Sequence, residues 1–161
     1  MDIPLIEQVK IQARMLVPLV KTLRAELGEE RANALVRKAL GDVYRKLGQD
    51  WWKQLGSSSP GEKMDGVWKA FSSGDALDYE VVRKTEDAYE VDVTGCRYAK
   101  FFKQIGEPEL GFLLVCSQDF PLAEGFGPGI QLTRKQTIMQ GASHCDFRFL
   151  LKQEKKGSTS G

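Results

Sequence analysis

Apolar residues recur every three to four positions over the first third of the chain, which is the spacing of amphipathic helices. One such stripe runs from Asp2 to about Leu27, and a second runs from Glu29 to Leu47. The opening aspartate is placed to cap the first helix, Pro18 should kink or split it, and Gly48 can close the second. The sequence therefore predicts an N-terminal helical pair within residues 1–55.

The remaining residues, 62–152, mix helical spacing with strand-like alternation after the loop GSSSPG. In chain order the pattern predicts a helix over 62–73, a β-hairpin of strands around 77–81 and 89–93, helices over Arg97–Ile105 and Pro108–Leu122, and strands over Ile130–Met139 and Cys145–Lys152. This order favours an α+β fold in which an antiparallel sheet of about four strands is covered by helices on one face.

Composition narrows the class of protein. The chain has 161 residues, of which 42% are hydrophobic and 28% charged, so we expect one globular domain over residues 1–152 and a disordered tail over 153–161. The sequence does not show whether the terminal GSTSG is native. A net charge of +1 argues against nucleic acid as a partner. The apolar runs are too short to span a membrane, and the N-terminus carries acidic residues where a signal peptide would be basic. We therefore expect a cytoplasmic protein with no membrane span and no signal peptide.

The chemically active side chains are few. The chain has one histidine and three cysteines, and it contains no GxGxxG after a strand, phosphate-binding loop, HExxH or GxSxG motif. An odd number of cysteines leaves at least one thiol outside any internal disulfide, and in a reducing compartment we expect all three to be reduced. Catalysis by this chain would therefore depend on thiols and carboxylates.

One cysteine lies just before a predicted helix and a second lies on one. Cys96 follows a strand and precedes a helix, whose N-terminal amides could lower the pKa of its thiol. Cys116 and Asp119 are three residues apart on one predicted helix and should share a face. They could act as a nucleophile with a proton-handling carboxylate, or as two metal ligands. Alternatively, both cysteines fill the core and Asp119 faces solvent or caps a helix.

The last predicted strand carries the third cysteine. Because neighbours on a strand point to opposite faces, Cys145 and His144 should not face the same pocket, and we expect Cys145 inside with the phenylalanines that follow it. His144 is kept as a secondary candidate for substrate binding. Arg134, on the preceding predicted strand, could bind a substrate carboxylate with two hydrogen bonds, or it could be a solvated strand arginine.

The sequence signal for a metal is weak, because no CxxC pair or closely spaced histidines are present. Zinc is the one cofactor left open, and its ligands would be Cys96, Cys116, Cys145 and Asp119. We predict that the three thiols share one site, where they are either free or bound to metal. A small molecule is the expected partner, and a homo-oligomer is compatible with the sequence.

Several runs in the second half of the chain resemble the L-2-amino-thiazoline-4-carboxylic acid hydrolase family. They are GCRYA from Gly95, GEPELG from Gly106, LVCSQD from Leu114, LTR with QT from Leu132, and CDFRF from Cys145, after Gly141. The resemblance covers about residues 77–152. It implies hydrolytic opening of a cyclic isothiourea to a carbamoyl-cysteine, and the residues that match the family pattern are Cys96, Cys116, Asp119 and Cys145.

In this interpretation Cys116 or Cys96 supplies a thiolate, Asp119 is the acid and base, and Arg134 binds the substrate carboxylate. A second resemblance, to 4-vinyl-reductase-type sensor domains, implies a binding module with a structural zinc and an apolar ligand pocket. That pocket would be lined by Trp51, Trp52, Trp68, Phe101 and Phe102. In a third interpretation the cysteines are only part of the core. The true substrate and the pathway stay open.

Overall fold

The computed structural model describes residues 2–152. In chain order its helices and strands are α1 (Leu5–Leu27), α2 (Glu29–Gln54), α3 (Pro60–Phe71), β1 (Leu77–Lys84), β2 (Ala88–Cys96), α4 (Arg97–Gln104), α5 (Pro108–Leu114), α6 (Asp119–Gly125), β3 (Ile130–Thr133) and β4 (Cys145–Leu151). Short 3₁₀ turns lie at Ser73–Asp75 and Cys116–Gln118. The tail predicted to be disordered, 153–161, lies outside the described residues. No helix of the described part is long and apolar enough to cross a membrane.

The four strands form one antiparallel sheet in the order β1-β2-β4-β3, which confirms the predicted α+β fold. In the central pair β2–β4, Val91 lies opposite Phe147 and Val93 lies opposite Cys145, and all four side chains are buried. The residues that alternate with these along each strand are polar, as expected when the other face of the sheet is exposed to solvent. Cys145 therefore faces inward, as the sequence predicts.

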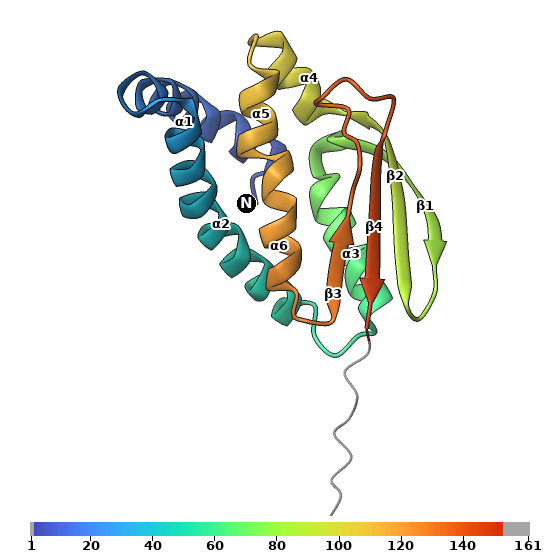
Figure 1. The fold of residues 1–161 in the computed structure, drawn as a ribbon. Coiled ribbons are helices and arrows are strands. Elements are labelled where there is room, and N and C mark those ends of the chain that lie inside the picture. Colours follow the sequence, from blue (N-terminus) through green and yellow to red (C-terminus); the bar gives the residue numbers. More distant parts are fainter. Residues whose placement is uncertain (1, 153–161) are drawn as a thin grey trace, which may run out of the picture.

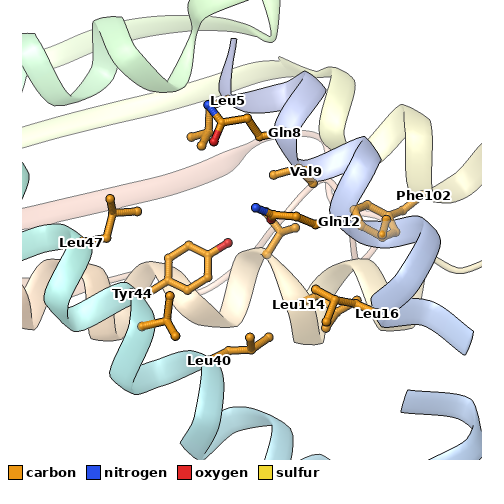
Figure 2. A pocket seen from close by; sticks show the side chains of 13 residues that line it. Leu5, Gln8, Val9, Gln12, Leu16, Leu40, Tyr44, Leu47, Phe102 and Leu114 are labelled. Atoms are coloured by element: carbon orange, nitrogen blue, oxygen red, sulfur yellow. The ribbon is translucent and has the colours of Figure 1, made fainter. Parts of the chain in front are cut away.

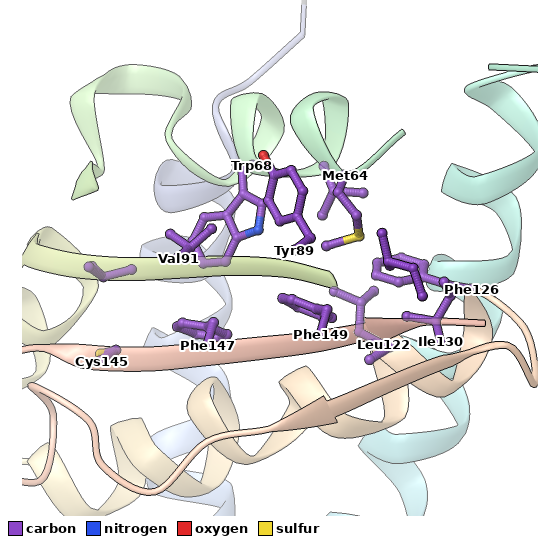
Figure 3. Close-up of a cluster of buried hydrophobic side chains, with 14 residues drawn as sticks. Met64, Trp68, Tyr89, Val91, Leu122, Phe126, Ile130, Cys145, Phe147 and Phe149 are labelled. Carbon is purple, nitrogen blue, oxygen red and sulfur yellow. The ribbon is translucent and has the colours of Figure 1, made fainter. Parts of the chain in front are cut away.

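Helices cover only the apolar face of the sheet. Trp68 of α3 packs edge-on against Phe147 of β4, with ring centroids 4.8 Å apart, and Phe126 just after α6 joins the same cluster (Figure 3). In Figure 1, α5 and α6 run between α2 and the sheet. A second cluster joins α1, α4 and α5, and Cys96 packs against both clusters.

The N-terminal helical pair is present, but its boundaries differ from those predicted. Asp2 does not cap α1, because the helix begins after Pro4, and Pro18 lies inside α1 without dividing it. Gly48 does not end α2, which continues to Gln54. It lies where α2 crosses α6, and a Cβ at this position would collide with the carbonyl of Leu122. This glycine is thus required by close packing rather than by a helix end.

Three further predicted elements are corrected. The helix predicted over Pro108–Leu122 is broken after Leu114 and resumes at Asp119. The strand predicted over Ile130–Met139 ends at Thr133. The helix predicted over Arg97–Ile105 ends at Gln104, and Ile105, just after it, is 45% exposed. The first two changes matter for function, because they place Cys116, Asp119 and Arg134.

Candidate functional site

A small cavity lies where the two apolar clusters meet. We call it the inner chamber; its volume is about 70 Å³, and all three cysteines line it together with Asp119 and Arg134. Its remaining lining is mainly apolar and comes from helices on one side and the inner face of the sheet on the other. The structure therefore brings together the four residues that match the family pattern.

Cys96 ends β2 and is also the N-cap of α4. Its Sγ accepts a hydrogen bond from the backbone N–H of Ala99 at 3.4 Å, so the predicted strand-to-helix junction is present. Burial nevertheless raises the pKa of the Cys96 thiol, and the amides of Ala99 and Tyr98 offset this only in part. The helix start therefore does not lower the pKa of the Cys96 thiol below its ordinary value, as the sequence suggests it could.

The helix break between α5 and α6 positions the Cys116 side chain. The hydroxyl of Ser117 and the side-chain amide of Gln118 both donate to the carbonyl of Leu113, at 2.6 and 3.1 Å. These side-chain donors take the place of continued α-helical bonding, and residues 116–118 form a 3₁₀ turn. Cys116 thus lies in a turn rather than in the middle of a helix as predicted, and Asp119 begins the next helix.

A buried ion pair anchors Asp119. Nη1 of Arg134 donates to its Oδ2 at 2.6 Å, and Nη2 donates to the carbonyl of Cys116 at 3.1 Å. The Arg134 side chain is 3% exposed and its guanidinium lies 5.0 and 5.3 Å from the ring centroids of Phe120 and Phe147. Arg134 can turn inward because β3 ends one residue earlier.

Burial is the main cause of the pKa shifts of the titratable groups that line the inner chamber. It raises the pKa of Asp119 to about 6, although the Arg134 guanidinium opposes this change. Burial likewise raises the pKa of Cys116 well above its ordinary value, with a further contribution from the Asp119 charge. The pKa of Cys145 is raised to about 11 by burial, although its Sγ accepts a hydrogen bond from the N–H of Ile138 at 3.2 Å. The resting thiols are therefore protonated at neutral pH.

Some predicted site residues lie elsewhere. His144 does not line the inner chamber; its ring lies within hydrogen-bonding distance of Gln136 Nε2 (3.2 Å) and Ser143 Oγ (2.9 Å). Of the aromatic residues proposed for the ligand pocket, Trp68 lines the inner chamber, whereas Trp51, Trp52, Phe101 and Phe102 do not.

Sequence reasoning missed Tyr44 and Thr137, which also line the inner chamber. Burial and the Asp119 charge raise the pKa of Tyr44 to about 12, so its hydroxyl stays protonated. Tyr44 lies in the apolar stripe of α2, where an aromatic residue is ordinary core, so its position in the sequence carries no functional signal. Within the described chain, the buried indole nitrogen of Trp68 has no hydrogen-bond partner.

The donor arrangement does not suit a metal. Residues 2–152 contain no group of three or more His, Cys, Asp or Glu side chains arranged to hold an ion. The carboxylate of the predicted zinc set is instead bound to Arg134. The geometry of the described residues therefore gives the predicted zinc site no support.

The fold is similar to that of a trafficking protein particle complex subunit. A solved structure of trafficking protein particle complex subunit 3 from Naegleria fowleri, covalently bound to palmitic acid, matches with a TM-score of 0.53 and 15% sequence identity. The match covers 89% of this chain and 97% of that protein. At this identity the likeness concerns the fold alone. No curated protein is significantly similar to the chain.

The family comparison agrees with the runs around the cysteines and extends further toward the N-terminus than they do. Residues 8–149 match the family described as L-2-amino-thiazoline-4-carboxylic acid hydrolase, so that α2 and most of α1 fall within the matched region. Since the match spans most of the chain, this protein belongs to the L-2-amino-thiazoline-4-carboxylic acid hydrolase family.

Proposed function

We propose that the protein is a hydrolase that opens a cyclic amidine or isothiourea, of which 2-amino-thiazoline-4-carboxylate is the type, in the inner chamber. The observation that carries this proposal is the Asp119 carboxylate, held by Arg134 at 2.6 Å in the same cavity as three thiols. Family membership supports a hydrolytic reaction.

Asp119 has the proton affinity that this reaction needs. With a pKa of about 6 it is mainly ionised at neutral pH and can accept a proton, and its conjugate acid is strong enough to return that proton. The thiols are protonated at rest, so a thiol that attacks must lose its proton in the same step. Asp119, three residues from Cys116, is the base within the chamber.

The reaction balances with these groups. The nucleophile, either the Cys116 thiol or a water molecule, gives its proton to Asp119 as it bonds to the amidine carbon. The tetrahedral carbon then expels a ring heteroatom, which keeps the bonding electron pair and takes the proton back from Asp119. If the thiol attacks, the amidine carbon stays bound to the cysteine sulfur until a water molecule adds to it and gives its proton to Asp119. The sulfur then leaves with the bonding electron pair, takes that proton back, and the carbon is released as the carbamoyl product. Arg134 holds Asp119 in place, and its remaining N–H groups are candidates for hydrogen bonds to a polar group of the substrate.

The test is turnover of 2-amino-thiazoline-4-carboxylate by wild type and by Asp119→Asn, an isosteric change. We expect kcat to fall by about 100-fold or more in the variant, and wild-type kcat to rise with pH through about 6. The matched control is Asp92→Asn, which alters an Asp–Arg pair on the other face of the sheet and should leave turnover unchanged. Equal turnover in wild type and Asp119→Asn would contradict the proposed role.

Serine variants distinguish the nucleophiles. A large loss of turnover in Cys116→Ser but not in Cys96→Ser would assign Cys116, and the reverse would assign Cys96. If both variants keep full activity, water is the nucleophile and the thiols only line the chamber. If the wild-type protein does not turn over the thiazoline, this compound is not the substrate.

A second candidate function is a module that binds a small apolar ligand without reaction. The mainly apolar lining of the chamber and its protonated thiols favour it. The solved structure with a similar fold holds palmitic acid covalently, which is a further reason to test it. Mass spectrometry of the purified protein under native and denaturing conditions would detect a bound ligand and show whether it is covalent. A protein with no ligand that nevertheless turns over the thiazoline would exclude this candidate.

A further inference from the structure

A larger cavity lies beside the inner chamber. This cavity, which we call the helical cleft, has a volume of about 200 Å³ and lies between α1 and α2, with Phe102 of α4 and Leu114 of α5 at its base (Figure 2). None of its lining residues is charged; the polar ones are Gln8, Gln12 and Tyr44. The helical cleft is thus almost three times the size of the chamber that holds the reactive groups.

The two cavities adjoin each other. Leu5 and Val9 of α1, Tyr44 of α2 and Val115 after α5 line both of them. Tyr44 lies at the boundary, and Figure 2 shows its hydroxyl directed toward Gln12. A molecule bound between α1 and α2 therefore lies directly beside the chamber that holds the thiols and Asp119, with only these shared side chains in between.

The charges at the inner end favour an uncharged polar group. The Arg134 charge is matched by Asp119 at 2.6 Å, and no other charged side chain lines the inner chamber. A free carboxylate or ammonium group would lose its hydration there without gaining a counter-charge of its own. A neutral head can still hydrogen-bond to the pair.

We infer that the helical cleft binds the single hydrocarbon tail of a ligand whose small, uncharged polar head lies in the inner chamber. This inference rests on the proposed function only in placing the reacting group beside Asp119, and among cyclic amidines it favours a neutral substrate with a hydrocarbon tail over the charged thiazoline, which would be a weaker ligand. The cleft is then a specificity site that the reaction itself does not require.

The first test measures binding of a homologous series of alkanols, from butanol to decanol, by calorimetric titration. Affinity is expected to rise about fourfold per added methylene, which is the value for burying one such group. Octanoate is expected to bind at least tenfold more weakly than octanol. An affinity independent of chain length, or a preference for octanoate, would overturn the inference.

The second test fills the cleft. Val43 lines it and is 60% exposed, so Val43→Trp should fold and block the tail; binding of octanol should fall about tenfold or more while binding of butanol is unchanged. The control is Leu35→Trp, which is 44% exposed on the same helix and does not line the cleft. A milder variant, Val43→Ser, should weaken octanol alone. Equal effects on both alkanols, or no effect in either Val43 variant, would contradict the tail site.

Two further outcomes separate alternatives. If light scattering shows a dimer that Val43→Trp dissociates while alkanol affinity stays the same, a second copy covers the cleft and the inference is wrong. Alkanol binding is measured without turnover, so it tests the tail site separately from the proposed reaction. If alkanol affinity rises with chain length but the protein does not hydrolyse the thiazoline, the tail site is supported and the proposed reaction is contradicted. If the protein hydrolyses the thiazoline but alkanol affinity does not depend on chain length, the proposed reaction is supported and the tail site is contradicted.

Discussion

Two Asp–Arg pairs lie on opposite faces of the same sheet. On the inner side Arg134 contacts Asp119 at 2.6 Å, and on the outer side Arg148 contacts Asp92 at 2.8 Å. The Arg134 side chain is 3% exposed, whereas that of Arg148 is 33% exposed and also lies 3.7 Å from Glu90. Nearly equal distances thus occur in different surroundings, one among aromatic rings and one beside water.

The difference shows what makes Asp119 suitable for chemistry. Water screens the outer pair, and such pairs contribute little to stability. Around the inner pair, water is largely replaced by the rings of Phe120 and Phe147, so removing one charge leaves the other poorly solvated. The two carboxylates differ little in pair distance or in exposure, which is 20% for Asp119 and 28% for Asp92, whereas the burial of the arginine partner and the aromatic rings around it differ strongly.

The largest expected effect comes from removing each arginine in turn. Arg134→Met leaves Asp119 buried without its partner and should lower the free energy of unfolding by about 3–5 kcal/mol at neutral pH. Arg148→Met should lower it by no more than about 1 kcal/mol. Urea unfolding followed by circular dichroism measures both values. Equal losses in the two variants would mean that the faces do not differ in the way described.

The pH dependence of stability sharpens the same contrast. The folded-state pKa of Asp119, about 6, is higher than that of an unfolded aspartate, about 4. Its contribution to stability is therefore complete below about pH 4 and is lost as the pH rises through about 6. Asp119→Asn cannot ionise and should lack this pH dependence, so the free energy of unfolding of wild type should fall by up to about 3 kcal/mol relative to that of the variant between about pH 4 and neutral pH.

An outer-face carboxylate should behave in the opposite way. Burial acts to raise the pKa of Asp146, but N–H donation from Gln136 and Lys135, each at 2.9 Å, outweighs it and lowers the pKa. Stability from Asp146 is present above the unfolded pKa and is lost as the pH falls through the folded value. Asp146→Asn should therefore lose stability relative to wild type at neutral pH and recover toward it in acid. Denaturation midpoints across the pH range test both signs.

The fold could largely be predicted from the sequence because its signals are local. Two-residue alternation marked the β-hairpin and placed Cys145 inward, and amphipathic spacing marked α1 and α2. The errors occur where tertiary contacts override local preference. Gly48 looks like a helix end but is a crossing point between α2 and α6, and Arg134 leaves the strand pattern because Asp119 binds it.

The gathering of the three cysteines and Asp119 around one cavity was also predictable, but the electrostatics of that cavity were not. The three cysteines and Asp119 were identified by residue type and by resemblance, and they share one cavity. The helix start at Cys96 suggested a lowered thiol pKa, yet burial raises it. The Tyr44 side chain gave no signal of its own, because an aromatic residue in an apolar stripe is ordinary core. Desolvation depends on the whole surrounding shell, which local sequence does not specify.

The smallest expected effect concerns Cys96, the one thiol that also lines a wide outer depression, with Lys100 and Lys103. Cys145 is 7% exposed and has a pKa of about 11, so alkylation near pH 8 should modify Cys96 first, by about tenfold or more.

Negatively charged iodoacetate should prefer Cys96 about two- to threefold more strongly than neutral iodoacetamide does, because the lysines attract it and salt weakens that attraction. Peptide mass spectrometry after timed alkylation measures the ratio of Cys96 to Cys145 modification for each reagent. Lys100→Gln should reduce the preference of iodoacetate for Cys96 without changing the rate at which iodoacetamide modifies it. If Cys145 reacts as fast as Cys96 with either reagent, the inner chamber opens to solvent more readily than its buried lining indicates, and the contrast between the two faces of the sheet would be smaller in solution than in this structure.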